Sequence, residues 1–126
     1  MKIVQRTLFE EDKKVVSDHF DKSADVVFAQ GDSLDILTKC PDGFATLIIT
    51  SPPYNIGKEY ETQMKLEHYL NQLQPILKQL VRVLSPIGSL CWQVGNYVEK
   101  SEVFPLDIYF YPIFKQMGLQ LRNRII

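Results

Sequence analysis

The hydrophobic positions of this chain form short apolar runs that alternate with one long stretch of helical spacing. Residues 25–30 and 45–50 are apolar runs with β-branched side chains, which are typical of strands. The run at 45–50 has no polar interruption larger than threonine, which predicts a strand buried on both faces of a parallel sheet. From about residue 64 to 84 the apolar positions recur every three or four residues, which predicts an amphipathic helix packed on that sheet.

The second half of the chain continues this alternation. Pro75 falls inside the predicted helix and is expected to kink or split it, because an interior proline costs about 3 kcal/mol. A strand over residues 89–94 follows, and a further helix begins at Pro105. A last strand is expected from about Leu119 to Ile126.

Alternating strands and helices indicate an α/β fold with a mainly parallel sheet. Residues 1–24 show no clean period and are interpreted as an N-terminal leader, within which Val15, Val16, His19 and Phe20 could form one face of a short helix. Residues 25–126 then form one partial domain, in which residues 45–94 are expected to make a right-handed βαβ unit.

Composition limits the classes of function. The 126 residues carry 14 basic and 15 acidic side chains, so the net charge of −1 does not indicate a nucleic-acid binder but leaves room for a local basic patch. Cys40 and Cys91 lack metal-site spacing, which favours no metal and a reduced, cytoplasmic chain with buried thiols. No apolar run approaches the ~18 residues of a membrane span, so no membrane partner is expected.

The most informative stretch is Ser51-Pro52-Pro53-Tyr54, directly after the strand at 45–50. Two prolines have no N–H groups for a sheet, so the strand must end there in a stiff loop. The strand-end carbonyls and the Ser51 hydroxyl can accept hydrogen bonds, and Tyr54 offers a flat face for stacking. This combination suits a planar ring with an exocyclic amine, although a Pro-Pro loop can also simply terminate a strand.

Ser51-Pro52-Pro53-Tyr54 resembles the catalytic motif of the amino-group DNA methyltransferases, which methylate cytosine N4 or adenine N6. The serine at the first position is most similar to the cytosine-N4 branch, since adenine-N6 enzymes more often carry Asp or Asn. Residues 31–35 resemble the Gly-Asp-(Ser/Ala)-Leu element of this family, and residues 82–90 resemble its Arg-Val-Leu-x-Pro-x-Gly turn. The resemblance covers about residues 26–126 and implies a partial Rossmann-like methyltransferase fold that uses S-adenosyl-L-methionine.

The resemblance implies roles for the motif. Ser51 Oγ and the Pro52 carbonyl would accept hydrogen bonds from the base amine and turn its lone pair towards the methyl group, so that positioning supplies most of the rate. Pro52 and Pro53 would stiffen the loop, and Tyr54 would stack on a base flipped out of double-stranded DNA.

The roles of the flanking residues keep alternatives open. Gly31 and Asp32 would contact the cofactor, yet Asp32 could equally cap the helix that begins at Ser33. Asn96 and Tyr97 could line the target-base pocket or could be simple turn residues. Lys58 and Tyr60 could contact the DNA backbone or could belong to a solvated loop.

The sequence also departs from the family. Its members are typically longer and carry an aromatic-x-Gly-x-Gly cofactor loop, whereas no two of the six glycines here are two residues apart. The chain therefore resembles a truncated catalytic half or one half of a split enzyme that needs a complementary chain. If so, the sheet lacks its middle strands and exposes an apolar face. The chain alone is then expected to be catalytically silent.

The leading hypothesis is a segment of a site-specific cytosine-N4 DNA methyltransferase of a restriction–modification system. An adenine-N6 DNA methyltransferase is the first alternative. A non-catalytic split or relic subunit is the second, and an RNA or protein methyltransferase is the third.

Overall fold

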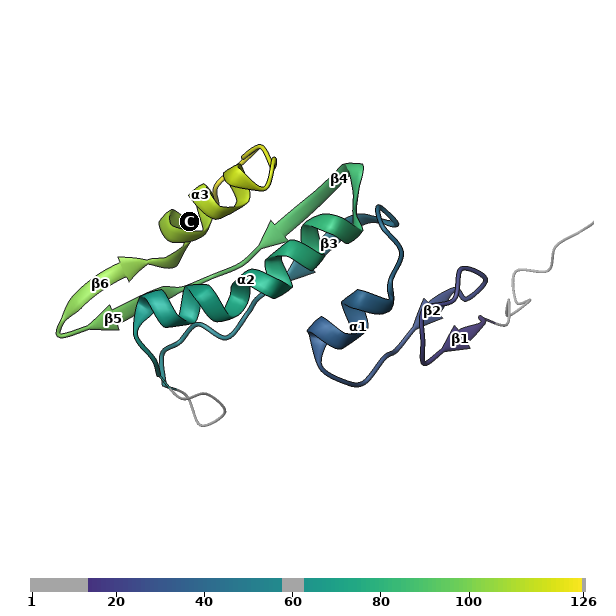
Figure 1. Ribbon diagram of the computed structural model, residues 1–126, viewed down its shortest axis with the longest axis horizontal. Coiled ribbons are helices and arrows are strands. Elements are labelled where there is room, and N and C mark those ends of the chain that lie inside the picture. The colour runs from purple at the N-terminus through teal and green to yellow at the C-terminus, as the bar shows by residue number, and fades with distance from the viewer. Residues whose placement is uncertain (1–13, 58–62, 126) are drawn as a thin grey trace, which may run out of the picture. The chain divides into compact units, whose positions relative to one another are not determined.

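A computed structural model describes residues 14–57 and 63–125, which divide into two units at Asp32 and Ser33 (Figure 1). In the first unit, β1 (Val16–Ser17) pairs in parallel with β2 (Val26–Val27). The expected short helix near β1 is wrong, because the Val15 carbonyl accepts hydrogen bonds from Asp25 and Val26 and so draws the segment into a strand pair. The strand predicted over residues 25–30 is confirmed but shorter. The leader boundary at residue 24 stays a prediction.

The second unit contains an α/β arrangement, as the sequence predicts. Its β3 and β4 strands are parallel, and the connection between them is the long helix α2, so the βαβ pattern expected over residues 45–94 is present. In chain order the elements are α1 (Ser33–Lys39), β3 (Ala45–Thr50), α2 (Leu66–Val83), β4 (Leu84–Trp92), β5 (Asn96–Glu99), β6 (Glu102–Pro105) and α3 (Leu106–Gln116).

Helix α2 supplies most of the core through one apolar stripe, made of Tyr69, Leu73, Leu77, Leu80 and Val83. The helix runs unbroken through Pro75, so a split at this proline is wrong, whereas a kink stays a prediction. Pro75 lies on the exposed side of α2, where water can bond the Asn71 carbonyl that the proline leaves without an N–H donor. The cost of the proline is therefore small enough for the packed stripe to offset.

Arg82 near the end of α2 connects the helix to α1. Its guanidinium donates to the carbonyls of Leu37 at 2.7 Å and Cys40 at 2.9 Å, and it pairs with Asp42. Carbonyls at a helix C-terminus lack intrahelical donors, so a cation is favoured there. The arginine of the Arg-Val-Leu element thus fixes the turn that leads into β3.

The C-terminal part contains a hairpin that sequence patterns missed. Strand β5 pairs with β6 in antiparallel fashion, and the two turn residues, Lys100 and Ser101, have φ angles of 49° and 67°. Residues 119–125 form no strand, so that prediction is wrong: no neighbouring strand is available to them among the described residues.

Helix α3 closes the core with aromatic packing. Phe110 meets Trp92 and Tyr69 edge-on, with ring centroids 5.1 and 6.1 Å apart. Edge-to-face contacts of this kind stabilise a core beyond the area they bury. The described residues include no helix long and apolar enough to cross a membrane.

One face of the β3–β4 pair is uncovered. Leu47 and Ile49 are 56% and 73% exposed, so the expected burial of β3 on both faces is wrong, whereas the expected exposed apolar face is confirmed. Cys91, which pairs in register with Ile49, is also exposed, which corrects the expectation of buried thiols. Within the described residues β3 has β4 as its only partner, so one of its edges is open.

Candidate active site

The Ser-Pro-Pro-Tyr loop leaves the carboxyl end of β3. The last register pair of the sheet joins Thr50 to Trp92, and the Gln93 N–H then donates to the Thr50 carbonyl at 3.0 Å. The two strands are therefore held together up to the residue before Ser51. The prolines end the ladder there, as the sequence predicts.

The loop presents two acceptors. The Tyr69 hydroxyl of α2 donates to the Pro53 carbonyl at 2.5 Å, so this oxygen is occupied, as is that of Thr50. Within residues 14–57 and 63–125, neither Ser51 Oγ nor the Pro52 carbonyl takes part in a hydrogen bond, and Ser51 is exposed. These are the two oxygens that, by the resemblance of the motif, are predicted to accept from the base amine.

Tyr54 is half-buried beside these acceptors and packs against the core cluster. Its ring lies against Gly95, which follows β4: a Cβ at Gly95 would lie 3.4 Å from Tyr54 Cδ2. The Gly95 carbonyl accepts the Leu106 N–H at 3.2 Å, which fixes this backbone. The Tyr54 ring therefore lies within van der Waals range of the backbone that follows β4.

Asn55 is a site residue that sequence reasoning missed. Its side chain is 2% exposed, and it donates to the Met64 carbonyl at 2.6 Å and accepts from the Met64 N–H at 2.7 Å. Its φ of 60° lies in the left-handed region, which asparagine tolerates better than most residues. An Asn directly after the motif is the one local signal, since the partner nine residues on could not be foreseen.

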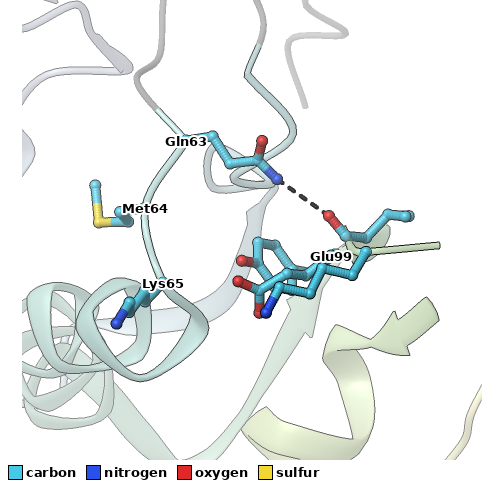
Figure 2. A pocket seen from close by; sticks show the side chains of 7 residues that line it. Gln63, Met64, Lys65 and Glu99 are labelled. Carbon is cyan, nitrogen blue, oxygen red and sulfur yellow. Dashed lines mark hydrogen bonds between the residues drawn. The ribbon is translucent and has the colours of Figure 1, made fainter. Parts of the chain in front are cut away.

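A polar pocket of about 330 Å³ lies next to the paired hydrogen bonds between Asn55 and Met64, which we call the Asn55 clamp (Figure 2). Gln63, Met64 and Lys65 line it from the segment that enters α2, and Glu99 lines it from β5. The Gln63 amide donates to the Val98 carbonyl at 3.1 Å, which joins the two walls. The pocket therefore lies between Met64, to which Asn55 is bound, and the β5–β6 hairpin.

The two predicted base-pocket residues on β5 differ in environment. Asn96 is exposed, whereas Tyr97 is 2% exposed and belongs to the core cluster. Burial, together with the nearby Glu99 carboxylate, raises the pKa of the Tyr97 phenol above its usual value. Tyr97 also lines the polar pocket. Their role in holding a base stays a prediction.

The other predicted residues belong to the first unit or lie outside the described residues. Gly31 and Asp32 close the first unit, where both are exposed, and they are described with that unit alone. Lys58 and Tyr60 lie outside the described residues. The site that the structure assembles therefore comprises the motif and its neighbours in the second unit.

Comparison with known proteins bears on this site. A family model described as a DNA methylase matches residues 45–126, which include β3, the motif and α2. The Type II methyltransferase M.BglII of Bacillus subtilis is 47% identical over 97 residues, which are 76% of this chain and 27% of that protein. M.ScaI of Streptomyces caespitosus is 36% identical over 83 residues, 66% of this chain and 27% of that protein. The chain thus spans about a quarter of the length of these curated relatives.

Two solved structures share the fold. TTHA0409 of Thermus thermophilus, a protein assigned as a DNA modification methylase, matches with a TM-score of 0.60 and 29% identity over 74% of this chain and 38% of that chain. It has also been solved in complex with S-adenosyl-L-methionine. The PvuII DNA methyltransferase, which is cytosine-N4-specific, matches with a TM-score of 0.52 and 27% identity over 71% of this chain and 32% of that chain. The α/β segment is thus consistent with part of a Rossmann-like methyltransferase.

Proposed function

Since the chain belongs to the DNA methylase family, we propose that it is a catalytic segment of a site-specific DNA methyltransferase that acts on an exocyclic base amine. One observation carries the proposal: Ser51 Oγ and the Pro52 carbonyl lie at a strand end without hydrogen-bond partners in the described chain, while the carbonyls on either side are occupied. Open acceptors beside a stackable ring fit an amine-bearing base.

The reaction needs an amine with a usable lone pair. A base amine is a weak nucleophile because its lone pair is delocalised into the ring. Ser51 Oγ and the Pro52 carbonyl accept hydrogen bonds from the two N–H groups of the base amine. These bonds favour a pyramidal nitrogen whose lone pair points away from the loop. Methyl transfer would form an N–C bond while the S–C bond of the sulfonium donor breaks to leave a thioether, and the surplus amine proton would pass to water. When bound, S-adenosyl-L-methionine supplies the methyl group.

The residues present fit the cofactor in part. Asp32 offers an exposed carboxylate after β2, and a carboxylate can accept hydrogen bonds from hydroxyl or amino groups of the adenosyl moiety. Gly31, whose φ is 157°, adds no side chain to this position. A glycine-rich loop is not among the residues of this chain. We therefore assign Gly31 and Asp32 as one side of the cofactor site.

Cytosine N4 is the favoured target. The serine at the first motif position resembles the cytosine-N4 branch, and the PvuII enzyme with which the chain shares its fold is cytosine-N4-specific. Adenine N6 is the alternative, because the two amines present the same donors to Ser51 and Pro52. The relatives are Type II methyltransferases, which supports a role in restriction–modification within the cytoplasm.

Double-stranded DNA and a complementary polypeptide are the proposed partners. The exposed side chains of Leu47 and Ile49 and the open edge of β3 provide an apolar surface on which further strands can pack. We propose that such a polypeptide carries the glycine-rich loop and that the 126 residues alone are inactive. The same surface also supports the second candidate, a non-catalytic subunit of a split enzyme.

Methyl incorporation into DNA tests the proposal. The chain is assayed alone and together with the segment of the M.BglII relative that lies outside the match, using radiolabelled S-adenosyl-L-methionine. Ser51→Ala should lower incorporation by about a hundredfold, because one of two aligning acceptors is lost. Thr38→Ala, which removes an exposed hydroxyl on α1 away from the open face of β3 and β4, is the control and should leave incorporation unchanged. Equal incorporation by both variants would refute the role of Ser51.

A further inference from the structure

Tyr54 is held from both sides by side chains outside the motif. The residue before it, Pro53, receives a hydrogen bond from Tyr69, and the residue after it, Asn55, is bound to Met64. We propose that Tyr69 and Asn55 are positioning residues that preset Tyr54 in the orientation in which it stacks on the target base. This inference rests on the proposed function for its meaning in catalysis.

Tyr69 acts through the peptide that joins Pro53 to Tyr54. The Pro53 carbonyl belongs to that peptide, so the 2.5 Å bond from the Tyr69 hydroxyl fixes the plane from which Tyr54 begins. The hydroxyl cannot move far, because the Tyr69 ring is buried and meets Phe110 edge-on at 6.1 Å. The position of Pro53 in the motif is thereby fixed relative to α2.

Asn55 acts on the other side. Its amide satisfies both the N–H and the carbonyl of Met64, and Met64 lies two residues before the start of α2. Displacing a buried amide whose oxygen and nitrogen are both hydrogen-bonded is costly, because each of these atoms would lose its hydrogen bond without gaining one to water. The chain that leaves Tyr54 is therefore anchored to the segment that enters α2, and the chain that enters Tyr54 is anchored to α2 itself.

These two anchors leave Tyr54 little freedom. With its backbone fixed on both sides, the ring lies beside Gly95, where a Cβ would be 3.4 Å from Tyr54 Cδ2. A side chain that is already ordered loses less entropy when a base stacks on it. The two positioning residues thus favour stacking without touching the base.

Fluorine NMR of the full 126-residue chain tests the inference. The six tyrosines are replaced by 3-fluorotyrosine, and the Tyr54 resonance is assigned from Tyr54→Phe. Tyr69→Phe keeps the buried ring and removes the hydroxyl, so the Tyr54 resonance should shift and broaden. Tyr111→Phe removes a hydroxyl from an exposed tyrosine on α3 and should leave that resonance in place. An unchanged Tyr54 resonance in folded Tyr69→Phe would overturn the role of Tyr69.

Asn55→Gly provides a second and independent variant. Glycine accepts the φ of 60°, so this substitution removes the two hydrogen bonds to Met64 without adding backbone strain. The Tyr54 resonance should broaden here too, and an unchanged resonance would overturn the role of Asn55.

Methyl transfer by the chain with the complementary segment gives the second readout. In each variant kcat should fall roughly tenfold, as expected for a misplaced reaction partner, with little change in the KM for S-adenosyl-L-methionine. A kcat equal to that of the unmodified chain would overturn the catalytic part of the inference. If the unmodified chain transfers no methyl group, the proposed function fails, whereas the fluorine spectra still decide whether Tyr69 and Asn55 hold Tyr54.

Discussion

Gly88 shows how one residue fixes the approach of β4 to β3. The register passes from the pair Ala45–Leu84 directly to Leu47–Ser89, so the residues between Leu84 and Ser89 bulge out of the ladder. A Cβ at Gly88 would lie 2.7 Å from Leu84 Cδ1 and 2.9 Å from the Ala45 carbonyl oxygen. The Arg-Val-Leu-x-Pro-x-Gly turn therefore needs glycine at this position, because any side chain would collide with Leu84 and the Ala45 carbonyl.

Gly88→Ala should lower the free energy of unfolding by about 1–3 kcal/mol, the usual cost of an added methyl group in a packed site. Urea denaturation measures this change from the midpoint of the transition. Ser89→Ala is the control, because Ser89 is exposed and its truncation removes no packing. The same midpoint in both variants would contradict the steric explanation.

The motif shows what residue types alone can and cannot indicate. The Pro-Pro pair predicts the end of β3 correctly, because the lack of N–H groups is a property of the residues themselves. The hydrogen bonds between Asn55 and Met64 could not be predicted, because the position of Met64 depends on where α2 begins and how it packs. Hydrogen bonds from a side chain to a distant backbone depend on the tertiary structure, so they leave almost no local signature.

Among the elements, the helix α2 is the best-predicted feature. Its apolar positions repeat with helical period, and the buried stripe of the structure follows that repeat. The exposed proline within it is the exception. An average cost for an interior proline says nothing about which side of the helix it occupies, and Pro75 occupies the solvent side.

Pro75→Ala should stabilise the chain by about 1–2 kcal/mol, because it restores a helical hydrogen bond and offsets this only in part by the greater freedom of the unfolded chain. Thermal unfolding followed by circular dichroism measures the gain. Gln74→Ala, in the same turn, isolates the effect of helix propensity and should change stability by much less. A loss of stability in Pro75→Ala would show that the proline conformation is needed by the fold.

The hairpin of β5 and β6 escaped prediction for a different reason. Two-residue hairpin loops usually carry Asn-Gly or a related pair, since both central residues need positive φ. Here Lys100 and Ser101 occupy these positions, and neither is typical of them. The C-terminal strand failed in the opposite way: its alternating sequence fits a strand, but a strand forms only where a partner is available.

For the chain as a whole, the open sheet is the dominant feature. One face of β3 leaves Leu47 and Ile49 exposed, and one of its edges has no partner among the described residues. Apolar faces and free edges of this kind favour association with further strands. The chain spans about a quarter of the length of its curated relatives.

The identity of the methylated nucleoside decides whether the Ser-Pro-Pro-Tyr loop aligns an exocyclic amine. DNA is incubated with labelled S-adenosyl-L-methionine, the chain and the complementary segment of the relative, and is then hydrolysed to nucleosides. We expect label in 4-methylcytosine that is lost with Ser51→Ala. Label in 6-methyladenine would keep the amine chemistry and change the base. Label in 5-methylcytosine, or label that does not depend on Ser51, would contradict the alignment of an amine by this loop.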